Sequence, residues 1–273
     1  MSIGMNWATA SRIPEWSVPL SGHTVAMFKK LLAAAGVGGA EVETELHTPG
    51  VQPGGTVHGV VRVRGGSVPQ EISRIGLEFV TKVEYEHTEE EYEQNRGFAP
   101  VTVHGPFHLP TGAVFDIPFA IHAPWETPIT FYNGHHLPGM AVSVRTIVEI
   151  AGAVDAGDSD PIGVGALPVQ HVVLAAMEQL GFRLRRADVE QGWIRGIQQE
   201  LGFYQEIEFA RSPRYPGIGE VEVTFVAGQD GAEVVLEVDR SRGDGYLGFY
   251  IDHSGVDGDW TAEIDRMISG IGH

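Results

Sequence analysis

The residues best suited to chemistry in this sequence are carboxylates, and the densest group lies between Glu84 and Glu93. Six of these ten residues are Glu. Such a run could bind a basic partner or a divalent cation. A cation cage needs turns that bring oxygens together, and the run has no Gly before Gly97. We interpret it as a solvated strand end and loop that offers candidate partner contacts at Glu84, Glu86, Glu89, Glu90, Glu91 and Glu93.

A small basic cluster, Arg183, Arg185 and Arg186, follows a segment with a helical pattern. These side chains could complement the negative end of the helix dipole, or receive an acidic partner or an acidic linker of this chain. We favour the interpretation that these arginines make contacts within the chain. The three arginines remain candidate partner contacts.

Other carboxylates have spacings that favour an ordinary surface. Glu206 and Glu208 would lie about 7 Å apart on one side of a strand, a separation also found in glycoside hydrolases, but alternating Glu is common on solvent faces. Asp252 and the loop 257–259 supply several oxygens, yet they lack the EF-hand spacing and its closing Glu. We predict polar surfaces at both places.

The spacing of the His, Ser and Gly residues also matches no known kind of catalytic site. His104 and His108 are about 13 Å apart if extended, and His135 and His136 would point to opposite faces of a strand. There is no Cys, no Gly-x-Ser-x-Gly elbow and no phosphate-binding loop, since 36–40 lacks the Gly-Lys-Ser/Thr ending. We therefore predict no catalytic, cofactor-binding or metal-ligating residue and no cofactor.

Composition limits the classes of partner. The 273 residues include 36 Asp and Glu against 18 Lys and Arg, which gives a net charge of -18. So acidic a protein is repelled by phosphate backbones and anionic lipids, so nucleic acid is not expected as a partner. No run approaches the 18 or so apolar residues of a membrane span. The missing Cys is compatible with a reducing cytoplasm.

A period of two dominates the first half of the chain and predicts strands. In 41–46, Val42, Thr44 and Leu46 alternate with three Glu residues, and the longest such run is 75–85. Similar one-sided alternation occurs in 57–64, 101–107, 114–121 and 142–150. Six or seven such strands in about 125 residues indicate an antiparallel β-sandwich.

The second half combines one helix with further strands. Pro168 suits a first helical position, Gly181 suits the position after a helix, and the apolar residues between them recur at helical spacing. Period two then returns in 207–209, 221–225, 234–238 and 247–251. We predict a mainly β fold of two tandem antiparallel β-sandwich lobes, with a short helix at 28–35 and one helix near the junction between the lobes.

This pattern predicts four regions. Residues 1–26 are expected to form a poorly structured extension, or to result from a start codon that was assigned too early. Residues 27–166 are expected to form the N-terminal lobe. Residues 167–251 contain the helix and the C-terminal lobe, and 252–273 form an acidic tail.

Several stretches resemble, in order and spacing, the bacterial sporulation-control family SpoOM. They are Met27 to Leu31 with Gly38 to Val42, Pro53 to Val61, Arg64 to Gly66, Ile121 to Ile129, Ala175 to Arg185, Phe203 to Phe209 and Val234 to Asp239. The resemblance spans roughly 27–240. It implies an arrestin-like pair of β-sandwich lobes in a cytoplasmic bacterial protein. The family supplies no catalytic residues to transfer to this chain.

The resemblance also implies a regulatory or scaffolding role in sporulation, cell-cycle or stress control without enzymatic activity. This role would depend on contact with a protein partner, because paired sheets offer edges and loops for binding. The alternative is a module that binds a small ligand or a metal ion, with hydrolysis as one form of it. The abundance of His and carboxylates supports that alternative.

Overall fold

A computed structural model describes residues 39–87, 90–240 and 243–271 of the chain. The extension at 1–26 and the helix expected at 28–35 lie outside these residues. Strands make up most of the described chain, so the mainly β class is confirmed.

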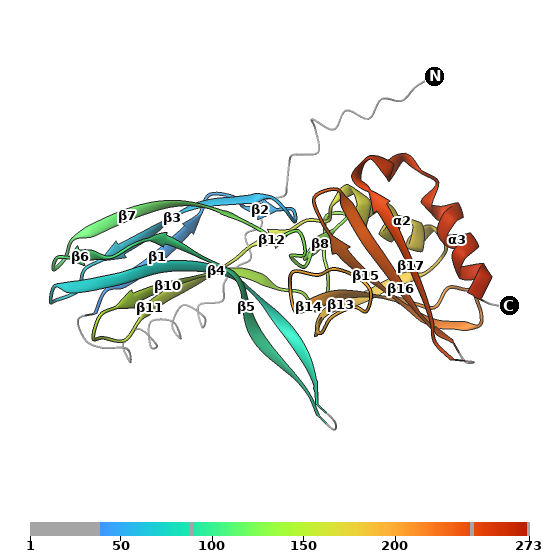
Figure 1. The fold of residues 1–273 in the computed structure, drawn as a ribbon, viewed down its shortest axis with the longest axis horizontal. Coiled ribbons are helices and arrows are strands. Elements are labelled where there is room, and N and C mark those ends of the chain that lie inside the picture. Colours follow the sequence, from blue (N-terminus) through green and yellow to red (C-terminus); the bar gives the residue numbers. More distant parts are fainter. Residues whose placement is uncertain (1–38, 88–89, 241–242, 272–273) are drawn as a thin grey trace, which may run out of the picture.

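The N-terminal half is a sandwich of two sheets (Figure 1). One sheet contains β1 (Glu41–Leu46), β3 (Thr56–Arg64) and β7 (Val114–His122). The other contains β4 (Gln70–His87), β5 (Glu90–His104), β6 (Phe107–Leu109), β10 (Val142–Ile150) and β11 (Ala156–Pro161). Apolar residues of the predicted alternation such as Val61 and Phe79 are fully buried between the sheets, whereas Val101 and Phe115, in the stretches 101–107 and 114–121, are exposed.

Two pairs of short strands close the end of this sandwich. The strands β2 (Gly50–Val51) and β12 (Gly163–Val164) pair in parallel, and β8 (Phe131–Tyr132) pairs with β9 (His135–His136).

The C-terminal half is built on five antiparallel strands. They are β13 (Arg183–Gln191), β14 (Phe203–Ala210), β15 (Ile218–Ala227), β16 (Gly231–Arg240) and β17 (Gly245–Asp252). The first of them joins the other half through a parallel pairing of Glu190 with Glu84 on β4. One ten-stranded sheet therefore runs through both halves. The division into lobes at residue 166 stays a prediction.

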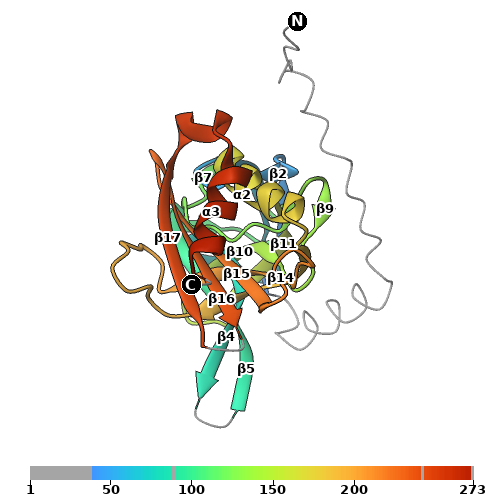
Figure 2. The same cartoon turned by 90° about the vertical axis from the view of Figure 1, so that its right-hand side faces the viewer.

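Two α-helices lie on one side of these five strands (Figures 1 and 2). The predicted helix is present as α2 (Pro168–Gln179), and Gly181 follows it with a φ of 86°. The N–H of Phe182 donates to Met177 O, and that of Gly181 donates to Glu178 O, which is the pattern of a Schellman cap. The layer facing the C-terminal strands is therefore helical, which differs from the second sheet expected there.

The segment 252–273 was expected to be a tail, but its described residues fold against the body of the protein. It contains η2 (His253–Asp257) and α3 (Trp260–Ile271). Ile264 and Ile268 lie on one face of α3 and are buried, and Trp260 stacks on Phe249 of β17. The tail interpretation was wrong because it gave weight to Gly and Asp and overlooked the apolar pair four residues apart.

The ends of β4 and β5 form a hairpin that projects from the body of the molecule (Figures 1 and 2). Its base lies beside β13, because Glu84 is the residue that pairs with Glu190. The hairpin thus connects the two halves of the protein at its base.

Candidate functional site

The projecting hairpin contains most of the carboxylates singled out in the sequence. We name residues 82–87 and 90–95 the acidic hairpin. Its register places Glu84 opposite Glu93 and Glu86 opposite Glu91. Like charges directly opposite each other on neighbouring strands are destabilising. The acidic hairpin therefore concentrates negative charge at a cost in folding stability.

Two contacts offset part of this repulsion. The ammonium group of Lys82 lies 2.6 Å from a carboxylate oxygen of Glu93. The rings of Tyr85 and Tyr92 stack with their centroids 5.3 Å apart. Among the remaining candidates, Glu86, Glu90 and Glu91 have a described backbone position, and Glu89 lies outside the described residues.

A second acidic surface covers the side of the C-terminal strands that faces away from the helices. We name it the carboxylate face. It consists of Asp188, Glu190, Glu206, Glu208, Glu220, Glu222 and Glu237. Residues two apart share one side of a strand, and the ladders place these strands side by side in register. Glu206 pairs with Asp188, and Glu222 pairs with both Glu208 and Glu237.

A β-bulge in β13 supplies two cations to one end of this face. The register shifts between Leu184 and Arg186, so that Arg185 and Arg186 both reach the carboxylates of β14 and β15. Arg186 lies 2.7 Å from Glu208 and 3.3 Å from Asp188, and Arg185 lies 2.9 Å from Glu220. Both arginine side chains therefore form ion pairs within the protein. Arg183 is exposed.

The other end of the face contains carboxylates that crowd each other. Burial raises the pKa of Glu206 to about 8, and the charges of Glu222 and Asp188 add to the effect. Burial also raises the pKa of Glu222 to about 7, with Glu237 as the main neighbouring charge. Glu237 accepts a hydrogen bond of 2.6 Å from the hydroxyl of Tyr246. At neutral pH this end of the face retains protons that ordinary carboxylates would lose.

Asp188 is buried, with an exposed fraction of 8%. Its Oδ2 faces Arg186, while its Oδ1 has no hydrogen-bond partner among the described residues. Burial raises the pKa of Asp188 to about 6, against the opposing charge of Arg186. A buried oxygen without a donor is costly and requires an explanation.

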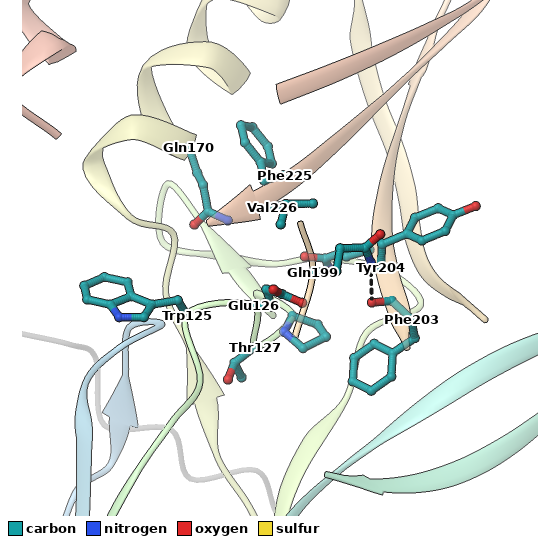
Figure 3. Close-up of a pocket in the computed structure, with 11 residues that line it drawn as sticks. Trp125, Glu126, Thr127, Gln170, Gln199, Phe203, Tyr204, Phe225 and Val226 are labelled. Atoms are coloured by element: carbon teal, nitrogen blue, oxygen red, sulfur yellow. Dashed lines mark hydrogen bonds between the residues drawn. The ribbon is translucent and has the colours of Figure 1, made fainter. Parts of the chain in front are cut away.

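A narrow pocket lies where the loop after β7 meets the C-terminal half (Figure 3). Trp125, Glu126 and Thr127 line it from the loop, and Gln199, Phe203 and Phe225 line it from the C-terminal half. It has room for about one water molecule, so it is too small for an organic ligand.

Hydrogen bonds around this pocket fasten the two halves together. The carboxylate of Glu126 accepts from the N–H groups of Glu200, at 2.6 Å, and Leu201, at 2.9 Å. Burial raises the pKa of Glu126, and these two donors partly oppose that effect. The buried amide of Gln205 accepts from Ile129 N and donates to Ile129 O, at 2.9 and 2.8 Å. The pocket is therefore a structural junction.

The other acidic loop considered in the sequence serves to cap helices. Asp252 accepts from the N–H of Ser254 at the start of η2, and Asp259 accepts from the N–H of Ala262 at the start of α3. Of the histidines, His108 lies 2.6 Å from Glu71, and His104 contacts the carbonyl of Gly105. None of these side chains belongs to a cluster of three or more potential metal ligands within the described chain.

Sequence reasoning missed the carboxylate face as a unit. The alternation of Glu206 with Glu208 is interpreted in the sequence as an ordinary solvent face, and the similar pair Glu220 and Glu222 is not connected to it. The signal that would have joined them is the repeated spacing on successive strands. It becomes informative only once the register of those strands is known.

Together, these observations define a mainly β, two-part protein with strongly acidic surfaces. No described helix is both long and apolar enough to cross a bilayer. A model of the SpoOM protein family matches residues 28–242. The chain belongs to this family.

Comparisons with individual proteins agree with this family assignment. The sporulation-control protein Spo0M of Bacillus subtilis is 37% identical over 218 residues, which cover 79% of this chain and 81% of that protein. The crystal structure of Spo0M from the same organism superposes with a TM-score of 0.74 at 32% identity. That match covers 86% of this chain and 98% of the crystallised chain, so the resemblance found in the sequence is confirmed.

Proposed function

We propose that this chain is a cytoplasmic regulator of sporulation that acts by contact with a protein partner and not by catalysis. Membership of the sporulation-control family supports the regulatory role. The same mechanism, contact with a protein partner, would also serve a scaffolding role in cell-cycle or stress control.

The acidic hairpin is the surface we assign to this contact, and its register is the observation on which the assignment rests. Glu84 faces Glu93 and Glu86 faces Glu91 on a projecting element. A partner with Lys and Arg side chains would relieve the repulsion between these pairs, so binding gains energy that the free protein lacks. The contact should weaken with salt, because it would depend on attraction between opposite charges.

The alternative of a small-ligand module would have to use the open groove beside the junction pocket, about 710 Å³ in volume and lined by Trp125, Glu126 and Trp193 among others, because the junction pocket itself has room for about one water molecule. The hydrolytic form of that alternative needs a nucleophile or an activated water beside a base. No such arrangement was identified at the junction pocket.

The role can be tested in Bacillus subtilis cells that lack their own Spo0M. Three versions of this chain would be expressed: the unaltered chain, a hairpin variant (Glu86→Lys, Glu90→Lys, Glu91→Lys) and a control variant of β1 (Glu41→Lys, Glu43→Lys, Glu45→Lys). We expect the unaltered chain and the control to change the sporulation frequency toward that of cells with Spo0M. The hairpin variant should have no such effect. An equal effect of all three versions would exclude the hairpin as the contact.

A further inference from the structure

We propose that the carboxylate face binds a divalent cation, with Ca²⁺ preferred, between Asp188, Glu190 and Glu206. Each of these residues offers one carboxylate oxygen, and the three oxygens lie within 4.8 Å of one another. They come from adjacent strands, since Asp188 is paired with Glu206 across β13 and β14, and Glu190 is two residues along β13.

The chemistry of the donors favours a hard cation. All three ligands are carboxylates, and the cluster contains no His or Cys. Oxygen-only sites suit Ca²⁺, Mg²⁺ and Mn²⁺, whereas zinc and copper prefer sites with nitrogen or sulfur.

The kind of ligand set favours Ca²⁺ over Mg²⁺. Mg²⁺ demands a near-ideal octahedral shell, keeps several waters and is usually bound through one or two carboxylates, whereas Ca²⁺ accepts several protein oxygens in a flexible geometry. A cluster of three protein carboxylates therefore suits Ca²⁺ better. Because Glu190 and Glu206 are only half-buried, water would complete the coordination shell.

Asp188 provides an independent reason for a ligand here. Its side chain is more than nine-tenths buried, and its Oδ1 has no hydrogen-bond partner in the described structure. Arg186 holds the other oxygen, Oδ2, and so fixes the orientation of the carboxylate. A cation bound by this carboxylate would compensate for the partner that its buried oxygen lacks.

Neighbouring charges strengthen the attraction for a cation. Glu206 also belongs to a second triad of carboxylates with Glu222 and Glu237. The positive charge of Arg186, 3.3 Å from Asp188, opposes part of this attraction, but Glu206, Glu222 and Glu237 add three carboxylates on the side away from it.

The test uses the full chain, produced without a His tag and freed of metal by a chelator. Calcium binding would be measured by titration calorimetry at about pH 8.5, where the carboxylates are mostly ionised, and by thermal unfolding with about 1 mM CaCl₂. We expect saturable binding of about one Ca²⁺ and a rise in Tm of several degrees. Magnesium should bind at least about tenfold more weakly, because it requires a stricter octahedral shell and gives up its waters reluctantly.

Three variants localise the site. Glu206→Gln and Asp188→Asn should weaken Ca²⁺ binding at least about tenfold and abolish the rise in Tm. The matched control is Glu233→Gln, which lies on the same side of β16, four residues and about 13 Å from Glu237. It should bind Ca²⁺ like the unaltered chain. Because Glu206→Gln removes a repelled charge, it should fold without metal.

Two outcomes would overturn the proposal. One is the absence of heat and of any shift in Tm when Ca²⁺ is added. The other is a shift that persists in Glu206→Gln, or that KCl of equal ionic strength reproduces, since either result would mean general screening of surface charge.

Discussion

At the scale of single residues, the crowded carboxyl groups determine how this protein should respond to pH. Burial and like charges raise the pKa to about 8 at Glu206, about 7 at Glu222 and about 6 at Asp188. Each of these groups binds its proton more tightly in the folded protein than in the unfolded chain. Their contribution is therefore fully present below about pH 4 and is lost as the pH rises toward 8.

We predict that the free energy of unfolding declines between about pH 5 and pH 8.5 in the absence of divalent cations. Carboxylates with lowered pKa values, such as Asp116 beside Arg62 and Glu149 beside Arg74, set the acid limit, because their stabilisation is lost at still lower pH. Urea unfolding at a series of pH values measures the loss of stability at both the alkaline and the acid end. Greater stability at pH 8.5 than at pH 6 would contradict the account of the carboxylate face.

Glu206→Gln should flatten this decline. At about pH 8.5 the variant should be more stable than the unaltered chain by on the order of 1 to 2 kcal/mol, after allowance for solvent screening. At about pH 5 the two should agree within about 0.5 kcal/mol, because Glu206 is then protonated. Urea unfolding at both pH values gives the comparison, and an equal effect at both would mean that charge is not responsible.

Gly54 is a position where both conformation and space exclude a side chain. Its φ is 76°, and a Cβ atom would lie 2.7 Å from the indole ring of Trp125. We predict that Gly54→Ala lowers the free energy of unfolding by about 2 kcal/mol or more. Gly112→Ala is the matched control, because its φ is also positive, at 66°, but its Cβ would meet open space. Urea unfolding of the pair isolates the clash with Trp125, and equal losses would argue against it.

At the scale of elements, α3 is an integral part of the C-terminal half. Ile264 has no exposed surface and Ile268 has 2%. The helix is also held by its Asp265, whose carboxylate accepts hydrogen bonds from Tyr215 and Arg214 in the loop between β14 and β15. It therefore lies beside α2 and extends the helical layer on this side of the C-terminal strands.

We predict that Ile264→Ala lowers the free energy of unfolding by about 2 to 4 kcal/mol, because it leaves a cavity under the helix. The control is Arg266→Ala on the exposed side of the same helix, which should change stability by less than about 0.5 kcal/mol. Chemical denaturation measures both. Similar losses in the two variants would mean that the helix does not pack as described.

Local patterns predicted the elements well where one side of a strand or helix is buried. The alternation from Ile75 to Tyr85 and the Pro168 and Gly181 boundaries of α2 are examples, because burial and backbone geometry act within a few residues. The carboxylate face could not be predicted in the same way. It depends on which strands are neighbours and on their register, and these are long-range properties of the sheet.

At the scale of the whole molecule, the junction determines whether the two halves act as one body. The ten-stranded sheet continues across it, and the amide of Gln205 binds both backbone groups of Ile129. Both partners are buried, so these hydrogen bonds are shielded from water.

We predict that Gln205→Ala lowers the free energy of unfolding by about 2 to 3 kcal/mol, because it leaves the N–H and C=O of Ile129 without partners. Gln198→Ala, at an exposed position of the nearby loop, is the control and should have little effect. Urea unfolding measures the loss. An unchanged stability in Gln205→Ala would mean that water replaces the amide and that the junction is looser than described.

The acidic hairpin is the feature through which the whole molecule is proposed to act. The most direct measurement is affinity purification from the native host, followed by mass spectrometry, with the unaltered chain, the hairpin variant and the β1 control variant. We predict that the unaltered chain and the control recover the same basic partner, released by moderate salt, and that the hairpin variant does not. Equal recovery of that partner by the hairpin variant would contradict the proposed contact.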